Sequence, residues 1–162
     1  MEKEFLQIIQ KNQGIIHKVC NIYCYEEEDR NDLFQEIVAQ LWKSYPSFRN
    51  DSKFSTWMYR VALNTAITSF KKQKRRPDQN KLSYDNFQIA DEKYDNETEE
   101  NIKLLHRAVS QLTGIEKSIV LLFIEDKGYE GIAEITGITQ NYVRVKMNRI
   151  KKKLKKLMVN KG

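Results

Sequence analysis

The sequence contains few of the residues from which enzymes build catalytic or metal sites. Among 162 residues there are two histidines, His17 and His106, and two cysteines, Cys20 and Cys24. It has no glycine-rich phosphate loop and no Cys/His cluster at metal-ligand spacing. A zinc site at His17 and the two cysteines would need a fourth ligand, and no candidate is spaced nearby. We therefore expect a protein that is not an enzyme and binds no cofactor.

Long hydrophobic runs and secretion signals are also missing. No apolar run reaches the roughly 18 to 20 residues that span a bilayer. The N-terminal sequence MEKEFLQIIQ lacks the cationic start and apolar stretch of a signal peptide. Cys20 and Cys24 stand four residues apart in a helical pattern, which indicates reduced, partly buried thiols rather than a secreted disulfide framework. These absences predict a cytoplasmic chain with no membrane insertion.

Strict alternation of apolar and polar residues, the pattern of a half-buried strand, is absent, and apolar residues recur at helical spacing. We therefore expect an all-α fold. Residues 5–22 give a first helical stretch with Gly14 as a weak point, and Asp32 opens a second helix that Pro46 stops. The side of this second helix that faces the core is predicted to carry Leu33, Ile37, Val38, Leu41 and Trp42.

Composition divides the chain into two halves. Residues 77–100 are rich in Asp, Asn, Glu, Gln and Lys and poor in apolar residues, which is typical of a linker. We predict two small helical domains, residues 1–76 and 101–162, joined by an acidic flexible linker over residues 77–100. In the second half, Thr113 and Glu116 stand three residues apart ahead of an apolar run, which is the signature of a capping box.

The net charge of +6 is concentrated in two blocks. One block is residues 71–76, KKQKRR, and the other lies within residues 144–156, with the acidic linker between them. Two basic modules joined by one linker could each contact the same polyanion at a separate place. Nucleic acid is therefore the expected partner.

The last third of the chain has the pattern of a helix-turn-helix motif. YEGIAEITG and ITQNYVRVKMNRIKKKLKKL are two amphipathic segments separated by a tight connection at Thr136 and Gly137. The apolar stripe of the second segment is expected to face the core, so the opposite face is the candidate for reading bases. That face carries Asn141, Arg144, Val145, Asn148, Arg149 and Lys152. The lysines expected to hold phosphate are Lys151, Lys153, Lys155 and Lys156. The alternative is a basic surface helix with no nucleic-acid role.

A tryptophan lies among cations in the helix that follows residue 53. At about 100° per residue, its core side is predicted to carry Phe54, Met58, Val61, Ala62, Thr65 and Ser69. Another side carries Trp57, Arg60, Asn64, Lys71 and Arg75. An indole there can stack on a base while the cations hold phosphate. The alternative is a tryptophan at the rim of the core beside a solvated face.

A third group of polar residues, Asp32, Gln35 and Glu36, shares one face of the second predicted helix. Carboxylates at this position would repel DNA. A protein partner is therefore the sharper interpretation, and a solvated helix face is the alternative.

Together these motifs resemble the extracytoplasmic-function (group IV) class of bacterial RNA polymerase sigma factors. DLFQEIVAQLWKSYPSFRNDSKFSTWMYRVALNTA looks like the family's region 2, and YEGIAEITGITQNYVRVKMNRIKKKL looks like its region 4. The resemblance implies a factor that binds core RNA polymerase and directs promoter-specific initiation. In such a factor the first domain melts the start-proximal (−10) element and the second reads the upstream (−35) element.

The resemblance also implies roles for single residues. Asp32, Gln35 and Glu36 match the family's D-x-x-Q-E positions, which contact the clamp helices of the polymerase β′ subunit. The residues assigned to the −10 element are Phe48, Arg49, Asn50, Asp51, Ser52, Lys53, Trp57, Tyr59, Arg60, Asn64, Lys71 and Arg75. The face that carries Arg144, Val145, Asn148 and Arg149 is assigned to the −35 element. Further implied partners are the polymerase β flap, promoter DNA and an anti-sigma protein.

Two other functions fit parts of the pattern. A stand-alone helix-turn-helix regulator would bind duplex DNA specifically without polymerase. A sigma-factor mimic would bind polymerase or an anti-sigma protein without starting transcription. Trp57, Asn64 and Arg144 argue against a mimic, because a mimic has no need to keep its base readers.

Overall fold

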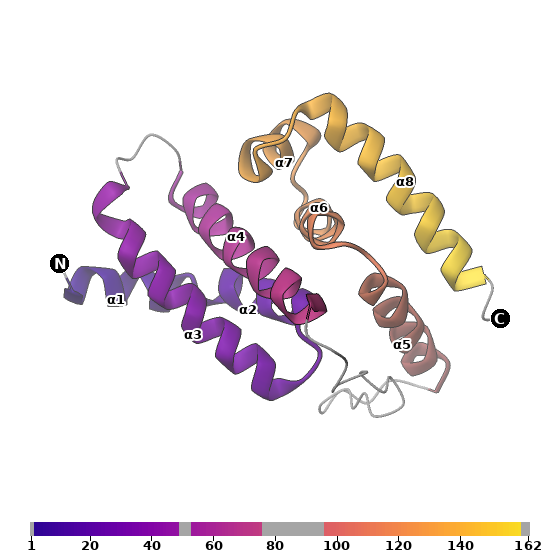
Figure 1. Cartoon of the computed structure of the whole chain (residues 1–162), viewed down its shortest axis with the longest axis horizontal. Helices are drawn as coiled ribbons and strands as arrows, with labels where there is room; N and C mark the ends of the chain where they lie inside the picture. The colour runs from indigo at the N-terminus through magenta and orange to yellow at the C-terminus, as the bar shows by residue number, and fades with distance from the viewer. Residues whose placement is uncertain (1, 49–52, 76–95, 160–162) are drawn as a thin grey trace.

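The computed structural model describes residues 2–48, 53–75 and 96–159, and every regular element in these ranges is a helix, as predicted (Figure 1). The first module comprises α1 (Glu2–Lys11), α2 (Gln13–Tyr23), α3 (Glu27–Ser44), a short 3₁₀ turn η1 (Tyr45–Ser47) and α4 (Phe54–Arg75). The second module comprises α5 (Asn96–Ser110), α6 (Gly114–Ile124), α7 (Tyr129–Thr136) and α8 (Gln140–Val159).

Polar side chains set helix ends that apolar periodicity does not show. The first helical stretch is broken at Asn12 rather than at Gly14, because the Asn12 side-chain amide donates a hydrogen bond to the Ile8 carbonyl at 2.9 Å and ends α1. Helix α3 begins at Glu27, ahead of the predicted Asp32. Its first turn is acidic throughout, which suits the positive end of the helix dipole.

Helix α5 also begins earlier than predicted, at Asn96, within the segment that we assigned to the linker. Its first turn carries Glu97 and Glu99, so acidic residues that resemble a linker by composition instead favour a helix start. The rest of the predicted linker, residues 77–95, lies outside the described residues.

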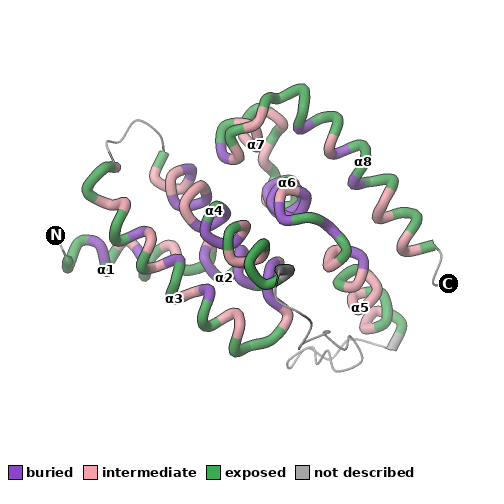
Figure 2. The backbone as a smooth tube through the Cα atoms, in the orientation of Figure 1, coloured by how far each residue is buried: buried purple, intermediate pink, exposed green. Residues whose placement is uncertain are grey.

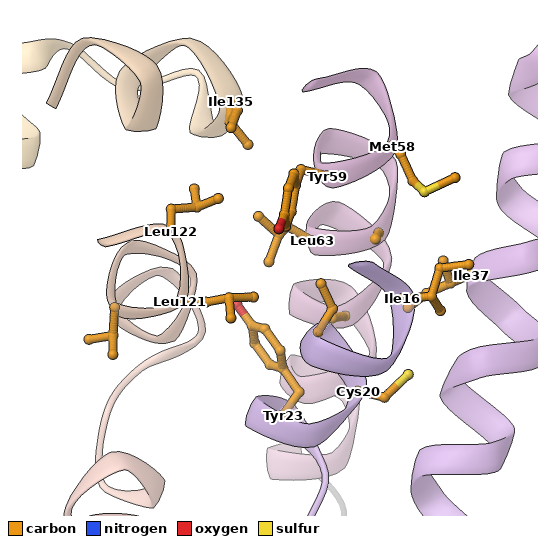
Figure 3. Close-up of a cluster of buried hydrophobic side chains, with 14 of the residues drawn as sticks. Ile16, Cys20, Tyr23, Ile37, Met58, Tyr59, Leu63, Leu121, Leu122 and Ile135 are labelled. Carbon is orange, nitrogen blue, oxygen red and sulfur yellow. The ribbon is translucent and has the colours of Figure 1, made fainter. Parts of the chain in front are cut away.

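The core of the first module is formed where α2, α3 and α4 pack together. Ile16, Ile37 and Met58, one from each helix, are fully buried and lie near one another in Figure 3. Trp42 was predicted on this inner side, but it is 44% exposed and meets Phe5 edge-on at 4.9 Å. The prediction was wrong because Trp42 follows Leu33 by nine residues, which at about 100° per residue is half a rotation away.

The second module contains the predicted capping box and helix-turn-helix. The Thr113 amide donates to Glu116 Oε1 at 2.8 Å, and the Glu116 amide donates to Thr113 Oγ1 at 3.2 Å. Gly137 ends α7 with φ +80°, a left-handed conformation that glycine adopts without steric cost. The Thr139 hydroxyl then accepts from the Tyr142 amide at 3.1 Å at the start of α8.

The two modules pack against each other, an arrangement that the sequence left open. Helix α6 contacts α2 and α4, and α7 contacts α4 (Figure 1). Helix α6 is buried over most of its length at this junction (Figure 2). The Tyr23 hydroxyl donates to the Gly114 carbonyl at 2.5 Å, and one cluster of buried residues runs through both modules.

Replacing Thr113 with alanine removes an acceptor from the capping box, and we expect the free energy of unfolding to fall by about 1 kcal/mol. Urea titration followed by circular dichroism measures this change. Thr68→Ala is the matched control, because the Thr68 hydroxyl only donates back to the Asn64 carbonyl within α4. Equal stability of the two variants would contradict a stabilising role for the capping box.

Candidate nucleic-acid interface

The outer face of α8 is an exposed polar surface of the helix-turn-helix. Val143, Met147 and Ile150 are buried against the module, so the opposite side of α8 is turned to solvent (Figure 2). All six predicted base readers lie there and are exposed, namely Asn141, Arg144, Val145, Asn148, Arg149 and Lys152. We call these six residues the recognition face. Amides and guanidinium groups so placed can donate and accept at base edges in a major groove.

The lysines at the end of α8 divide into two kinds. Lys151, Lys155 and Lys156 are exposed, as expected for phosphate contacts. Lys153 is only partly exposed, and its ammonium group lies 3.3 Å from Glu116 Oε1. Although burial of Glu116 opposes ionisation, the Thr113 amide and the Lys153 charge together lower the pKa of its carboxyl. Lys153 therefore ties α8 to the start of α6.

Trp57 belongs to a cluster of aromatic rings at the N-terminal end of α4. Its ring centroid lies 4.9 Å from that of Phe48, 5.3 Å from Phe54 and 6.3 Å from Tyr45. The side chain is half-buried. The cluster fixes the orientation of the indole and leaves part of it accessible, a geometry that can present a stacking surface to a base.

The remaining residues predicted to contact the −10 element fall into three groups. Lys53, Asn64 and Lys71 are exposed. Arg49, Asn50, Asp51 and Ser52 lie outside the described residues, as does the side chain of Arg75. Tyr59 and Arg60 contact the second module instead.

Tyr59 is 4% exposed, and its burial raises the pKa of its hydroxyl. In Figure 3 it lies with Leu63 on the side of α4 that faces Leu122 and Ile135. The Lys127 ammonium group is 6.0 Å from the centre of the Tyr59 ring. A residue assigned to DNA is thus enclosed between the modules in this arrangement.

Arg60 donates two hydrogen bonds to one carbonyl of the second module. Its Nε is 3.0 Å and its Nη2 2.8 Å from the carbonyl oxygen of Glu134 in α7. The guanidinium is therefore already engaged where DNA was expected to bind it.

Sequence reasoning missed the second apolar side of α4. Tyr59, Leu63, Ala66, Ile67 and Phe70 recur at helical spacing and cover the side of α4 next to the polar face. Their spacing was visible in the sequence, but a helix that is apolar on two sides gives a weak amphipathic signal. We had attributed only one apolar side to this helix.

Asp32, Gln35 and Glu36 are all exposed on one face of α3, which we call the carboxylate face. Helix α3 packs on α2 and α4, and it lies on the side of the molecule away from α8 (Figure 1). Acidic and basic functional faces are therefore well separated, which limits repulsion of DNA by the carboxylates.

Cys20 and Cys24 are free, buried thiols. Burial raises the pKa of Cys20 to about 12 and that of Cys24 to about 11, so both are protonated near neutral pH and are poor nucleophiles. Across the described ranges, no group of three His, Cys, Asp or Glu side chains is placed to hold a metal ion. None of the described helices has the length and apolar character needed to cross a membrane.

These features define a class of protein, a two-module helical DNA-binding protein with a helix-turn-helix in its second module. The sigma-70 region 2 family model matches residues 8–76, and the sigma-70 region 4 family model matches residues 102–154. The extracytoplasmic-function RNA polymerase sigma-E factor of Haemophilus influenzae is 30% identical, with 97% of this chain and 90% of the relative covered.

Two solved structures share the fold. One is CnrH in complex with the cytosolic domain of CnrY, with a TM-score of 0.71 and 15% identity over 100% of this chain and 92% of that chain. The other is the sigma factor RpoE of Bartonella quintana in complex with the anti-sigma factor NepR, with a TM-score of 0.71 and 16% identity over 96% of this chain and 97% of that chain.

The chain therefore belongs to the extracytoplasmic-function group of the sigma-70 family of RNA polymerase sigma factors. It binds core RNA polymerase and directs promoter-specific transcription initiation. Nothing in the comparisons supports a stand-alone regulator that acts without polymerase.

Lys155→Ala tests phosphate contact by the exposed lysines at the end of α8. We expect weaker binding to duplex DNA of any sequence, and a plot of log affinity against log salt that is shallower by about 1. Fluorescence anisotropy of the full chain with a random-sequence duplex measures both quantities. Lys3→Ala, on exposed α1, is the matched control for lost charge. A salt dependence that does not change would mean that Lys155 holds no phosphate.

Proposed function

We propose that three surfaces of the protein each bind a different partner during promoter recognition. The carboxylate face of α3 docks on the β′ clamp helices of core polymerase. The exposed side of α4 around Trp57 and Asn64 captures the −10 element, and the recognition face of α8 reads the −35 element. The first domain comprises residues 1–76, and the second begins with α5 and also meets the β flap.

The observation that carries this proposal is the sorting of charge and exposure on outward-facing helices. Asp32 and Glu36 are exposed on α3 without a basic neighbour among the ion pairs of the described residues. Arg144, Arg149 and Lys152 are exposed on α8, and α8 and α3 lie at opposite sides of the molecule (Figure 1). A protein contact and a DNA contact can therefore form at the same time.

Melting by such a factor needs no nucleotide hydrolysis. Unstacking a base costs a few kcal/mol, and stacking on an aromatic side chain returns about 1 to 3 kcal/mol per base. The Trp57 cluster is already assembled, so little ordering is required when a base arrives. We infer that the factor catalyses no reaction of its own and acts in the cytoplasm, where polymerase and chromosome meet.

An anti-sigma protein is the further partner that we propose. Support comes from an apolar groove of about 600 Å³ between the modules. Phe123 and Ile124 of α6, 44% and 64% exposed, lie at this groove with Leu105 of α5. Bartonella quintana RpoE, which has the same fold, was crystallised with its anti-sigma factor. An apolar helix of such a partner would cover these side chains.

In-vitro transcription on fragmented genomic DNA tests the function directly. Core RNA polymerase from the source bacterium is incubated with and without this protein, and transcript starts are mapped. We expect new starts that share two spaced upstream motifs. Specific duplex binding without polymerase, together with no new starts, would overturn the proposal.

Glu36→Ala removes a carboxylate from the face assigned to polymerase. We expect affinity for core polymerase to fall about ten-fold, which corresponds to about 1.4 kcal/mol. Surface-captured core polymerase and varied sigma factor give the dissociation constant. Glu4→Ala, an exposed carboxylate on α1, is the matched control. If Glu36→Ala bound core polymerase as tightly as the control, the assignment of this face would be wrong.

Asn64→Ala separates DNA capture from polymerase binding. Asn64 is exposed, and its replacement leaves the packing of α4 intact. We expect unchanged affinity for core polymerase and a loss of open complex of about ten-fold, because an amide contact to an unstacked base is lost. Permanganate footprinting measures the open complex, and Thr68→Ala, one turn further along α4, is the control. An equal loss of both activities would contradict the assigned role.

A further inference from the structure

The centre of the recognition face is apolar, whereas its other five residues are polar. Val145 is exposed, and at about 100° per residue it lies almost directly opposite the buried side of α8. Tyr142 is also exposed and precedes Val145 by three residues, so the two side chains are neighbours on the helix surface. Scattered exposed apolar residues are ordinary, but an adjoining pair at the centre of a binding face is suited to an apolar partner.

Cations surround this apolar pair. The Lys146 ammonium group lies 5.6 Å from the centre of the Tyr142 ring. The Arg144 guanidinium lies 5.8 Å from the centre of the Tyr129 ring of α7. Helix α8 contains no Asp or Glu. A positive field around an apolar centre favours a polyanion over a protein surface as the partner of Tyr142 and Val145.

The pair lies in the first two turns of α8, the part of a recognition helix that approaches base edges in the major groove. The Thr139 hydroxyl accepts from the Tyr142 amide at 3.1 Å and fixes the start of the helix. The apolar group that a base pair presents in the major groove is the C5-methyl group of thymine. Donors and acceptors of the other bases would lose water beneath a valine without gaining a hydrogen bond.

We propose that Val145, with Tyr142 beside it, contacts the C5-methyl group of a thymine in the upstream element. One position of that element is then selected through a methyl group, while the amides and guanidinium groups around Val145 read polar edges or hold phosphate. This inference rests on the proposed function, because it takes α8 as the reader of the −35 element.

Replacing thymine with deoxyuridine tests the contact, because this change removes only the methyl group. Promoter duplexes from the mapped starts are made with deoxyuridine at one thymine of the upstream element at a time. The complex of core polymerase and this protein is titrated with each duplex. We expect a loss of affinity of about three- to five-fold at one thymine, the range for a methyl-sized group. No loss at any thymine, or an upstream element without an A·T pair, would overturn the inference.

Val145→Ser identifies the side chain that reads the methyl group. Since Val145 is exposed, we expect the variant to keep its fold, which circular dichroism verifies. The variant should bind the thymine and deoxyuridine duplexes equally. Val159→Ser, the same change at an exposed position near the end of α8, is the matched control and should keep the wild-type preference. If Val145→Ser weakened binding to both duplexes by the same factor, Val145 would not contact the methyl group.

Two variants of Tyr142 separate its ring from its hydroxyl. Tyr142→Phe keeps the ring beside Val145 and should keep the preference for thymine. Tyr142→Ala exposes the methyl contact to water and should reduce the preference by about two-fold. An unchanged preference in Tyr142→Ala would refute the part assigned to Tyr142.

Failure of the inference differs from failure of the proposed function. If polymerase and the wild type yield no mapped starts, the proposed function is wrong and the inference falls with it. If starts appear and share an upstream motif, but no thymine methyl group in that motif contributes to binding, the function stands and the methyl contact is refuted.

Discussion

Helix α4 is packed on two sides at once, and the arrangement of the whole molecule depends on it. One side of α4 meets α2 and α3 and completes the core of the first module, while a second side meets α6 and α7. The Trp57 cluster and Asn64 lie on what remains of its circumference. A single helix therefore supports a core, an interface between modules and a nucleic-acid surface.

Charge is kept on separate helices that face away from each other. Helices α3 and α8, which carry the carboxylates and the cations, lie at opposite sides of the molecule (Figure 1). Two ion pairs, Lys18 with Glu125 and Lys153 with Glu116, join helices to one another. Because exposed charges interact weakly beyond about 10 Å at ordinary ionic strength, the two functional faces act almost independently. A sigma factor can in this way bind an enzyme and its DNA at once.

Much of the fold could be predicted from local pattern. The capping box at Thr113, the turn at Gly137 and the buried stripe of α8 depend on residues close together in sequence, and each is present as expected. Trp42 and the start of α5 were misassigned, the first through its rotational position and the second through acidic composition. The sequence places Tyr59 and Arg60 on α4. It does not predict which residues they contact, because those residues lie far along the chain.

The sequence by itself determined the helical class, the division into two modules, the family and the outward face of α8, because helical periodicity and capping are local properties. Only the tertiary structure decided that the modules share a junction, that Arg60 donates to Glu134, and that Tyr59 is enclosed. The reason is physical. The second apolar side of α4 indicates that another element packs on it. Which element does so depends on the complementary shapes of α6 and α7, which folding brings close to α4.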